Sequence, residues 1–246
     1  MQAINTLSSE TLTLPTKGMS STSQVHLIPW DPNSSEHVDR LVKQREDCGW
    51  DSEKVQPLWQ ERQRLGRKCI FWITLPIPTD EPDADGKLLL HFDMFPMDKR
   101  PLQDTSASIR GAPRAPTHES FYPVGHISLD SENPGTEGFG LDIPSEGVYW
   151  IKTFYVSKAL RGTGVGRAAM DTIEMMAVEK PLSARTLALD TVQKDSAIAL
   201  AIENTGQSPK MTAHGWYEKR HYELIHTVDD FYAPGLKTVF MKKDIT

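Results

Sequence analysis

The spacing of hydrophobic residues along the chain predicts short strands interleaved with amphipathic helices. Runs of β-branched and aromatic residues predict strands at residues 24–30, 68–77, 122–130, 148–156, 185–192, 222–228 and 236–241. Apolar residues three and four apart predict helices that begin near residues 33 and 52 and that cover 164–179, 195–203 and 211–220. This order predicts an α/β sandwich with a mostly antiparallel sheet, not the strict alternation of a doubly wound fold.

The first two predicted helices carry recognisable signals. Asn33 is followed three residues later by Glu36, which has the form of a capping box. In the second helix Pro57 is tolerable only near the first turn, and Gly66 is a plausible end. The expected buried stripe of this second helix consists of Val55, Leu58, Trp59 and Leu65.

A long segment between the second and third predicted strands breaks this pattern. Residues 79–120 contain repeated prolines with acidic, Ser and Gly residues between them, and only 87–95 are apolar enough to form an element. Connections of this length inside a compact domain are usually functional or disordered. We therefore expect a flexible extension at 1–22 and one domain at 23–246, with a Pro-rich insertion at about 79–120.

Composition narrows the class of protein. The 246 residues are 38% hydrophobic and 24% charged, which is ordinary for a soluble globular protein. The net charge of −6 argues against a nucleic-acid binder, and no apolar run is long enough to span a membrane. The first twenty residues show no secretory signal, and Cys48 and Cys69 are too few for a disulfide scaffold. We expect a cytoplasmic protein, with the nucleus as an alternative, that is a monomer or a homodimer.

A glycine-rich stretch follows the fourth predicted strand. Gly162, Gly164 and Gly166 open a predicted helix, and Arg161 and Arg167 flank them. Glycine lets backbone amides approach a ligand closely, and free amides at a helix N-terminus bind anions. The stretch therefore predicts a phosphate or pyrophosphate site, although the glycines alone equally fit a turn that packs the helix on the sheet.

Two known phosphate loops fit this stretch poorly. No Lys-Ser/Thr pair follows the last glycine, which excludes a Walker A loop. Gly164, Gly166 and Ala169 spell the GxGxxA dinucleotide fingerprint, but residues 157–163 separate it from the strand, and the surrounding order of strands differs. A dinucleotide-binding oxidoreductase therefore remains only an alternative.

The sequence resembles the GNAT family of N-acetyltransferases at two motifs. Val156 followed by Arg161-x-x-Gly164-x-Gly166 is similar to the family's acyl-CoA signature, and residues 216–222 are similar to its Tyr-x-x-x-Gly-Phe block. The resemblance implies a three-layer sandwich, with a mixed sheet of about seven strands flanked by about four helices. It also implies acetyl-CoA as cofactor and acyl transfer to a primary amine. We favour a small-molecule acceptor over a peptide, because the insertion could form a lid; a non-catalytic acyl-CoA-binding module is the alternative.

Carried onto this chain, the resemblance assigns a binding role to each part of the glycine stretch. Arg161 would begin the loop, and Phe154, Tyr155 and Val156 would offer edge-strand backbone to the pantetheine arm. The backbone amides that would contact the pyrophosphate are those of Gly162, Thr163, Gly164, Val165, Gly166 and Arg167.

The catalytic residues are less completely specified. Tyr217 stands where the family commonly places the proton donor to the leaving thiolate, although His221 replaces the family's glycine nearby. Thr153 occupies the place of the glutamate that many relatives carry, so Asp190 and His126, and less strongly Glu146, are candidate bases by residue type. The histidines lack the spacing of a zinc site, so no metal is expected.

Overall fold

The computed structural model describes residues 25–76 and 86–245. The extension predicted at 1–22 lies outside the described residues, as does the part of the predicted insertion before residue 86. The rest of the insertion and all of the predicted strands except residues 24 and 77 lie within them.

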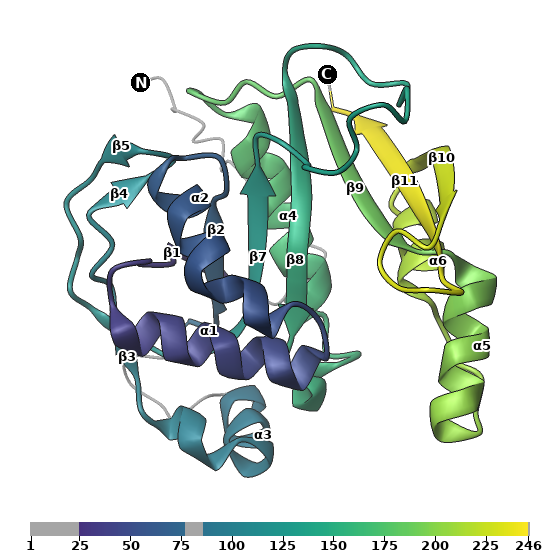
Figure 1. Ribbon diagram of the computed structural model, residues 1–246. Helices are drawn as coiled ribbons and strands as arrows, with labels where there is room; N and C mark the ends of the chain where they lie inside the picture. Colours follow the sequence, from purple (N-terminus) through teal and green to yellow (C-terminus); the bar gives the residue numbers. More distant parts are fainter. Residues whose placement is uncertain (1–24, 77–85, 246) are drawn as a thin grey trace, which may run out of the picture.

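A seven-stranded sheet forms the middle of the molecule (Figure 1). Its strands are β1 (His26–Pro29), β2 (Ile70–Thr74), β7 (Pro123–Asp130), β8 (Val148–Val156), β9 (Thr186–Val192), β10 (Glu223–Asp229) and β11 (Lys237–Asp244). They lie in the order β1-β2-β7-β8-β9-β11-β10, and each neighbouring pair is antiparallel except β8–β9. The mixed, mostly antiparallel sheet predicted from the sequence is confirmed.

Helices cover both faces of the sheet and complete the predicted three layers. On one face, α1 (Ser35–Cys48) and the α2 region pack against β2 through a cluster that includes Leu41, Trp59 and Trp72. On the other face, α4 (Val165–Val178) buries Val165, Ala169 and Ile173. Figure 1 shows α1 and α2 in front of β2 and β7, with α4 behind them. Both faces of the central strands are therefore removed from water, which explains why every residue of β7 is buried.

The first helix begins one residue later than the capping box predicted. The Ser34 side chain, not Asn33, caps α1 by accepting a hydrogen bond from the His37 amide at 3.4 Å. Asn33 instead turns the chain, because its amide donates to Asp31 Oδ1 at 2.9 Å. Gly49 ends the helix at φ 85°, a left-handed conformation that glycine adopts without cost.

The second predicted helix is divided into three short pieces. A 3₁₀ turn at Ser52–Lys54 and a wide turn at Val55–Trp59 precede α2 (Gln60–Arg64). Gln56 is extended (φ −115°, ψ 130°) because the following proline disfavours helical geometry. Val55 and Trp59 are buried as predicted, but Leu58 and Leu65 are 48% and 54% exposed, because the irregular turns rotate them out of the stripe.

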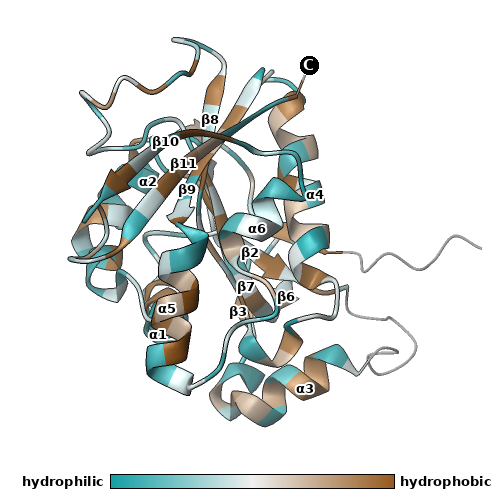
Figure 2. Ribbon diagram, turned by 90° about the vertical axis from the view of Figure 1, so that its right-hand side faces the viewer, coloured by the Kyte–Doolittle hydropathy of each residue, from teal (hydrophilic) through white to brown (hydrophobic). Residues whose placement is uncertain are grey.

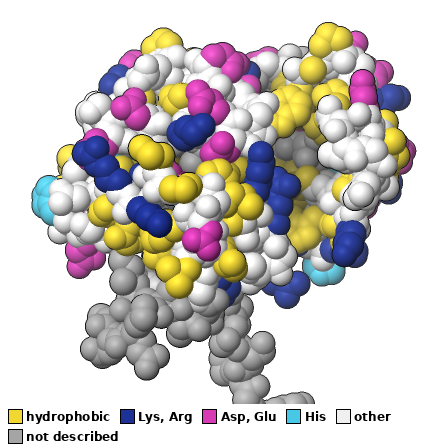
Figure 3. All heavy atoms as spheres, turned by 90° about the horizontal axis from the view of Figure 1, so that it is seen from below, with side chains coloured by type: hydrophobic (Ala, Val, Ile, Leu, Met, Phe, Trp, Pro, Cys, Tyr) yellow, Lys and Arg dark blue, Asp and Glu magenta, His cyan; other side chains and the backbone are white. Residues whose placement is uncertain are grey.

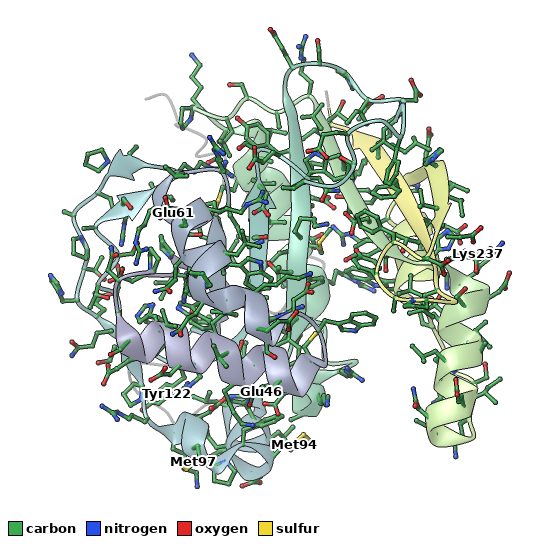
Figure 4. All side chains as sticks on the ribbon, viewed as in Figure 1. Glu46, Glu61, Met94, Met97, Tyr122 and Lys237 are labelled. Carbon is green, nitrogen blue, oxygen red and sulfur yellow. The ribbon has the colours of Figure 1, made fainter. Side chains whose placement is uncertain are left out.

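The described part of the insertion forms an ordered layer beside α1. It comprises α3 (Lys87–Met94), a 3₁₀ turn at Pro96–Lys99 and the strand pairs β3–β6 and β4–β5, with bounds Leu102–Gln103, Ser120–Phe121, Ser108–Ile109 and Ala112–Pro113. Arg40 of α1 approaches Asp98 at 3.4 Å and donates to the Arg100 carbonyl at 2.8 Å. Figure 4 shows Met94 and Met97 at the outer edge of this layer.

The C-terminal part of the chain forms a separate wing of the sheet. α5 (Lys194–Thr205) and α6 (Ala213–Glu218) connect β9 to β10. Figure 1 shows α5 projecting beyond the sheet, and the colours of Figure 2 show apolar and polar residues along it. No residue of α5 is buried. We call β9, β10 and β11 together with α5 and α6 the wing. These three strands form one end of the sheet, so the wing adjoins the rest of the molecule where β9 pairs with β8.

Candidate functional site

The sheet opens where β8 and β9 separate. The two strands pair in parallel only from Val148–Thr186 to Ile151–Leu189, and β8 continues for five residues beyond this register. Seen from below, the surface is hollowed between the main body and the wing, with Lys and Arg side chains at its rim (Figure 3). One edge of β8 is therefore left without a strand partner at this hollow, and unpaired edge groups can bind an extended ligand.

A bulge reshapes β8 at the point of separation. On the β7 side, Lys152 pairs with Ser128 and Tyr155 pairs with His126, so Thr153 and Phe154 together face one residue of β7. Thr153 has φ 47°, a conformation that is rare for a β-branched residue. Its hydroxyl and that of Ser128 are hydrogen bonded at 2.8 Å. The bulge re-aims the β8 backbone toward the hollow.

The glycine stretch presents backbone amides at the same end of β8. Gly162 and Gly164 have φ values of 81° and 91°, and Gly164 caps α4 without any side-chain hydrogen bond. Within the described residues, the amides of Gly162, Gly164, Val165, Gly166 and Arg167 have no acceptor. A Cβ on Gly166 would lie 3.7 Å from the Phe154 ring, so a larger side chain would fill the space above the loop. This is the geometry of an anion cradle.

A cavity of about 430 Å³ lies over this loop. Of the predicted cofactor residues, eight line it: Phe154, Tyr155, Val156, Arg161, Gly162, Gly164, Gly166 and Arg167. Two do not. Val165 is fully buried in the core, and the Thr163 hydroxyl donates to the Leu160 carbonyl at 2.7 Å.

The sequence analysis did not identify Trp216 as a residue of this cavity. Its ring stacks on Phe154 with centroids 6.1 Å apart, which closes one side of the cavity. The available signal was its position directly before Tyr217 in the second motif.

A second cavity, of about 220 Å³, adjoins the first on the other side of the bulge. Cys48 and Phe154 line both cavities. The second cavity is walled by the loop after α1, by β8 and β9, and by the β10–β11 loop, through Trp50, Asp51, Lys152, Thr153, Asp190, Tyr217 and Tyr232 among others. The site therefore has two adjacent compartments, which share residues at and near the bulge.

Tyr217 lies in the wall of the second cavity. It is placed by α6, which begins at Thr212, whose hydroxyl accepts a hydrogen bond from the Gly215 amide at 3.2 Å. Burial, together with the negative charge of Asp190, raises the pKa of Tyr217 well above its ordinary value. The phenol therefore keeps its proton throughout the neutral range. His221 follows at φ 66°, a left-handed conformation that explains why a glycine suits this position in the motif.

Asp190 faces the same cavity and is held by three donors. It forms an ion pair with Lys152, and the hydroxyl of Tyr232 and Nδ2 of Asn133 (2.8 Å) also donate to it. Its side chain is 1% exposed. This network fixes a carboxylate beside the bulge, and it ties the β10–β11 loop to β9.

His126 lies outside both cavities. It is fully buried and stacks on Tyr155 with centroids 5.4 Å apart. The side-chain amide nitrogen of Gln44 donates to the Pro123 carbonyl, so the amide oxygen of Gln44 accepts a hydrogen bond from Nδ1 of His126 at 2.8 Å. The other ring nitrogen of His126, Nε2, therefore carries no proton and faces Arg45. Burial, together with the charges of Arg45 and Lys68, lowers the pKa of His126 well below its ordinary value. The structure thus places His126 as a neutral support for Arg45, away from the cavity that Asp190 and Tyr217 share, and Glu146 is exposed and also lies outside both cavities.

Comparisons with known proteins agree with this arrangement. Residues 96–203 match the sequence profile of the acetyltransferase (GNAT) family, a range that includes β8, the glycine stretch and Asp190. A solved structure described as an acetyltransferase of the GNAT family from Desulfovibrio desulfuricans is 13% identical, with 90% of this chain and 99% of that chain covered at a TM-score of 0.51.

Two further solved structures are of the same kind. A spermidine N-acetyltransferase chimera from Vibrio cholerae and hSSAT is 8% identical over 90% of this chain and 96% of that chain, with a TM-score of 0.50. The structure of Arabidopsis thaliana NAA60 in complex with acetyl-CoA is 12% identical over 90% of this chain and 99% of that chain, with a TM-score of 0.49. Because the identities are this low, the structures from Desulfovibrio desulfuricans and of the spermidine N-acetyltransferase chimera establish the fold alone. No curated protein sequence matches the chain.

Proposed function

We propose that the chain, of which residues 96–203 match the profile of the acetyltransferase (GNAT) family, transfers the acetyl group of acetyl-CoA to a primary amine of a small molecule. One observation supports this most directly. The cavity over the glycine stretch and the cavity beside Asp190 and Tyr217 share Cys48 and Phe154, so two reactants would meet at the bulge of β8.

The first cavity fits the phosphate end and the arm of coenzyme A. Within the described residues, the amides of Gly162, Gly164, Val165, Gly166 and Arg167 have no acceptor and can donate to a pyrophosphate, and the α4 dipole favours its charge. Arg161 and Arg167 line the same cavity and add positive charge. The unpaired edge of β8 can satisfy the amides of a pantetheine arm. Bound acetyl-CoA supplies an acetyl thioester, and its carbonyl would lie near the bulge.

The residues around the bulge have distinct roles in this proposal. A β8 backbone amide donates to the carbonyl oxygen as negative charge develops on it. Tyr217, protonated because its pKa is raised, donates its proton to the leaving sulfur as the carbon–sulfur bond breaks. Asp190 accepts one proton from the acceptor ammonium, directly or through water, which frees the nitrogen lone pair to attack the thioester carbonyl. The second amine proton leaves as the carbon–sulfur bond breaks and, through water, replaces the proton that Tyr217 gives to the sulfur.

The size of the second cavity favours a small acceptor. Its volume of about 220 Å³ lies below the usual range for drug-sized ligands, which is about 300–1,000 Å³. In the described part of the insertion, no residue from 86 to 120 lines either cavity, so this part does not form the expected lid. Trp50 and Tyr232, whose ring centroids lie 5.8 Å apart, line this cavity instead.

Binding and turnover with the purified chain test this function. Coenzyme A should raise the melting temperature in a concentration-dependent way, whereas NAD should not. Release of free thiol from acetyl-CoA should depend on an added primary amine. Stabilisation by NAD but not by coenzyme A would instead favour a dinucleotide site, and coenzyme A binding without thiol release with any amine would favour a non-catalytic module.

A variant of the loop links binding to the proposed site. Gly166→Val should weaken coenzyme A binding at least about 10-fold, because its side chain would fill the space beside Phe154 and Val156. Met175→Val places the same residue on the exposed face of the same helix and should leave binding unchanged. Equal affinities in the two variants would remove the glycine stretch from the binding site.

A further inference from the structure

A buried arginine faces the smaller cavity without a full set of partners. The Arg45 side chain is 5% exposed and lines the cavity. Its Nε donates to the Trp50 carbonyl at 2.8 Å, and its Nη1 lies 3.5 Å from the unprotonated nitrogen of His126. Within the described residues Nη2 has no hydrogen-bond acceptor, and the carboxylate of Asp51 is 3.9 Å away. Arg45 therefore retains donors for another group.

The other charged groups of this cavity are already paired. Asp190 is neutralised by Lys152, and Asp51 lies 2.7 Å from Lys54. The four charged side chains that line the cavity are two cations, Arg45 and Lys152, and two anions, Asp51 and Asp190. Their charges sum to zero, and the guanidinium is the member with the weakest counterion. A ligand with one positive and one negative group matches this balance better than a polycation does.

We propose that the acetyl acceptor is an amino acid, whose carboxylate binds the Arg45 guanidinium while its amino group faces the bulge and Asp190. This inference rests on the proposed function of the site. A guanidinium matches a carboxylate in shape and donates two parallel hydrogen bonds to it, and both are stronger in a site away from water. Burial lowers the pKa of Arg45, which indicates a poorly solvated cation that gains from an anionic partner.

A purely structural role for Arg45 makes a different prediction. Arg45 also fixes the Trp50 carbonyl, and its guanidinium lies 5.3 Å from the centre of the Trp59 ring. If these contacts were its whole function, replacing Arg45 would lower stability but would not change which acceptors are preferred. Preference between acceptors therefore separates the two roles.

The unmodified protein provides the first test. Thiol release is measured with amino acids and with the amines that lack only the carboxylate: glycine against methylamine, β-alanine against ethylamine, and 4-aminobutyrate against propylamine. We expect kcat/KM to favour at least one amino acid by about 10- to 100-fold, the range of a hydrogen-bonded charged group. Equal or better use of every simple amine would overturn the inference and leave the acetyltransferase proposal standing. Failure of all acceptors, amines included, would instead count against the proposed function and the inference together.

Two variants then assign the preference to Arg45. Arg45→Met should lower kcat/KM for the preferred amino acid by about 10- to 100-fold, with little change for its simple amine and for coenzyme A affinity. Lys43→Met removes one exposed positive charge from the same helix and should keep the preference. Because Arg45→Met risks misfolding, Arg45→Lys is measured as well and should retain part of the preference. An unchanged preference in both folded Arg45 variants would overturn the assignment.

Discussion

At the scale of single residues, the site depends on backbone conformations that side chains rarely adopt. Thr153 and His221 both have positive φ values, of 47° and 66°. Such conformations cost about 1–3 kcal/mol each and persist only where the surroundings enforce them. Thr153 is held by the bulge and by the Ser128 hydroxyl, and His221 ends the turn that carries Tyr217. Thr153 lines the cavity at the proposed reaction centre, where the direction of the backbone matters most.

Removing the Tyr217 hydroxyl tests its role as proton donor. Tyr217→Phe should lower kcat for thiol release by about 100-fold or more, the usual range for a general acid, and leave coenzyme A affinity within about twofold. In the wild type the pKa of Tyr217 is raised, so loss of its proton should not lower kcat at any pH up to about 10. Tyr149→Phe, on β8 but outside both cavities, is the control. Full activity of Tyr217→Phe would exclude the phenol from the reaction.

Gly125 is required for a steric reason. A Cβ at this position would lie 2.2 Å from the Tyr155 carbonyl oxygen, where β7 and β8 approach each other beside the bulge. Gly125→Ala should therefore lower the free energy of unfolding by about 3 kcal/mol or more, because backbone must move. Gly138→Ala meets no atom within 4 Å and should cost only about 1 kcal/mol, from its φ of 95°. Similar losses in urea unfolding would contradict the steric explanation.

At the scale of elements, the described part of the insertion contacts the segment between β8 and the glycine stretch. His91 of α3 lies 2.8 Å through Nδ1 from the hydroxyl of Ser157, the residue that follows β8. Its Nε2 is 3.1 Å from Asp98, and Asp98 contacts Arg40 of α1. All four side chains are largely buried. The chain of contacts joins α1, the insertion and the start of the glycine stretch.

Breaking this chain should affect the loop more than the rest of the fold. His91→Ala should weaken coenzyme A binding about 10-fold, because Ser157 loses the partner that holds the beginning of the loop. His91→Asn can still hydrogen bond to Ser157 and should recover most of the affinity. Calorimetric titration of both folded variants is the measurement. If binding by His91→Ala equals that of the wild type, the insertion has no positioning role.

At the scale of the whole molecule, buried histidines couple stability to pH. The chain carries a net charge of −6, and within the described residues no helix is long and apolar enough to cross a membrane. His37 and His126 are buried, and burial lowers the pKa of each below 6.5. The unfolded chain therefore binds protons at these positions in a pH range where the folded chain does not.

This difference sets the direction of the pH dependence. As pH falls below about 6.5, the free energy of unfolding should decrease by up to about 1.4 kcal/mol per pH unit for each such histidine. His126→Gln should remove one contribution and reduce the slope between pH 6.5 and 5. Urea unfolding at several pH values measures both slopes. A steeper or unchanged slope in His126→Gln would show that His126 does not remain neutral in the folded protein.

Local patterns in the sequence determined the elements and the first half of the site. The apolar runs placed each of the seven strands of the sheet to within about three residues, because half-buried strands must alternate or be wholly apolar. Eight of the ten cofactor positions predicted from the glycine stretch and the end of the preceding strand line one cavity, since these residues are close along the chain. The prediction missed the residue that caps α1, because Asn33 and Ser34 are both suitable caps and the structure uses Ser34. It also missed the break in the second helix, where Gln56 is extended before Pro57.

The second half of the site was decided only by tertiary structure. The residues of this cavity come from four separate segments, and no local spacing brings these segments together: the end of α1 and the loop after it (Arg45, Trp50), β9 (Asp190), α6 (Tyr217) and the β10–β11 loop (Tyr232). The divergence of β9 from β8 creates the space that they line, and this divergence depends on the packing of whole layers. The same packing buries His126 beneath that space and leaves Asp190 in its wall, a difference that residue type could not reveal. The sequence by itself thus determined which segments form strands and where the amides of the glycine stretch lie, whereas the fold determined which charges meet an acceptor.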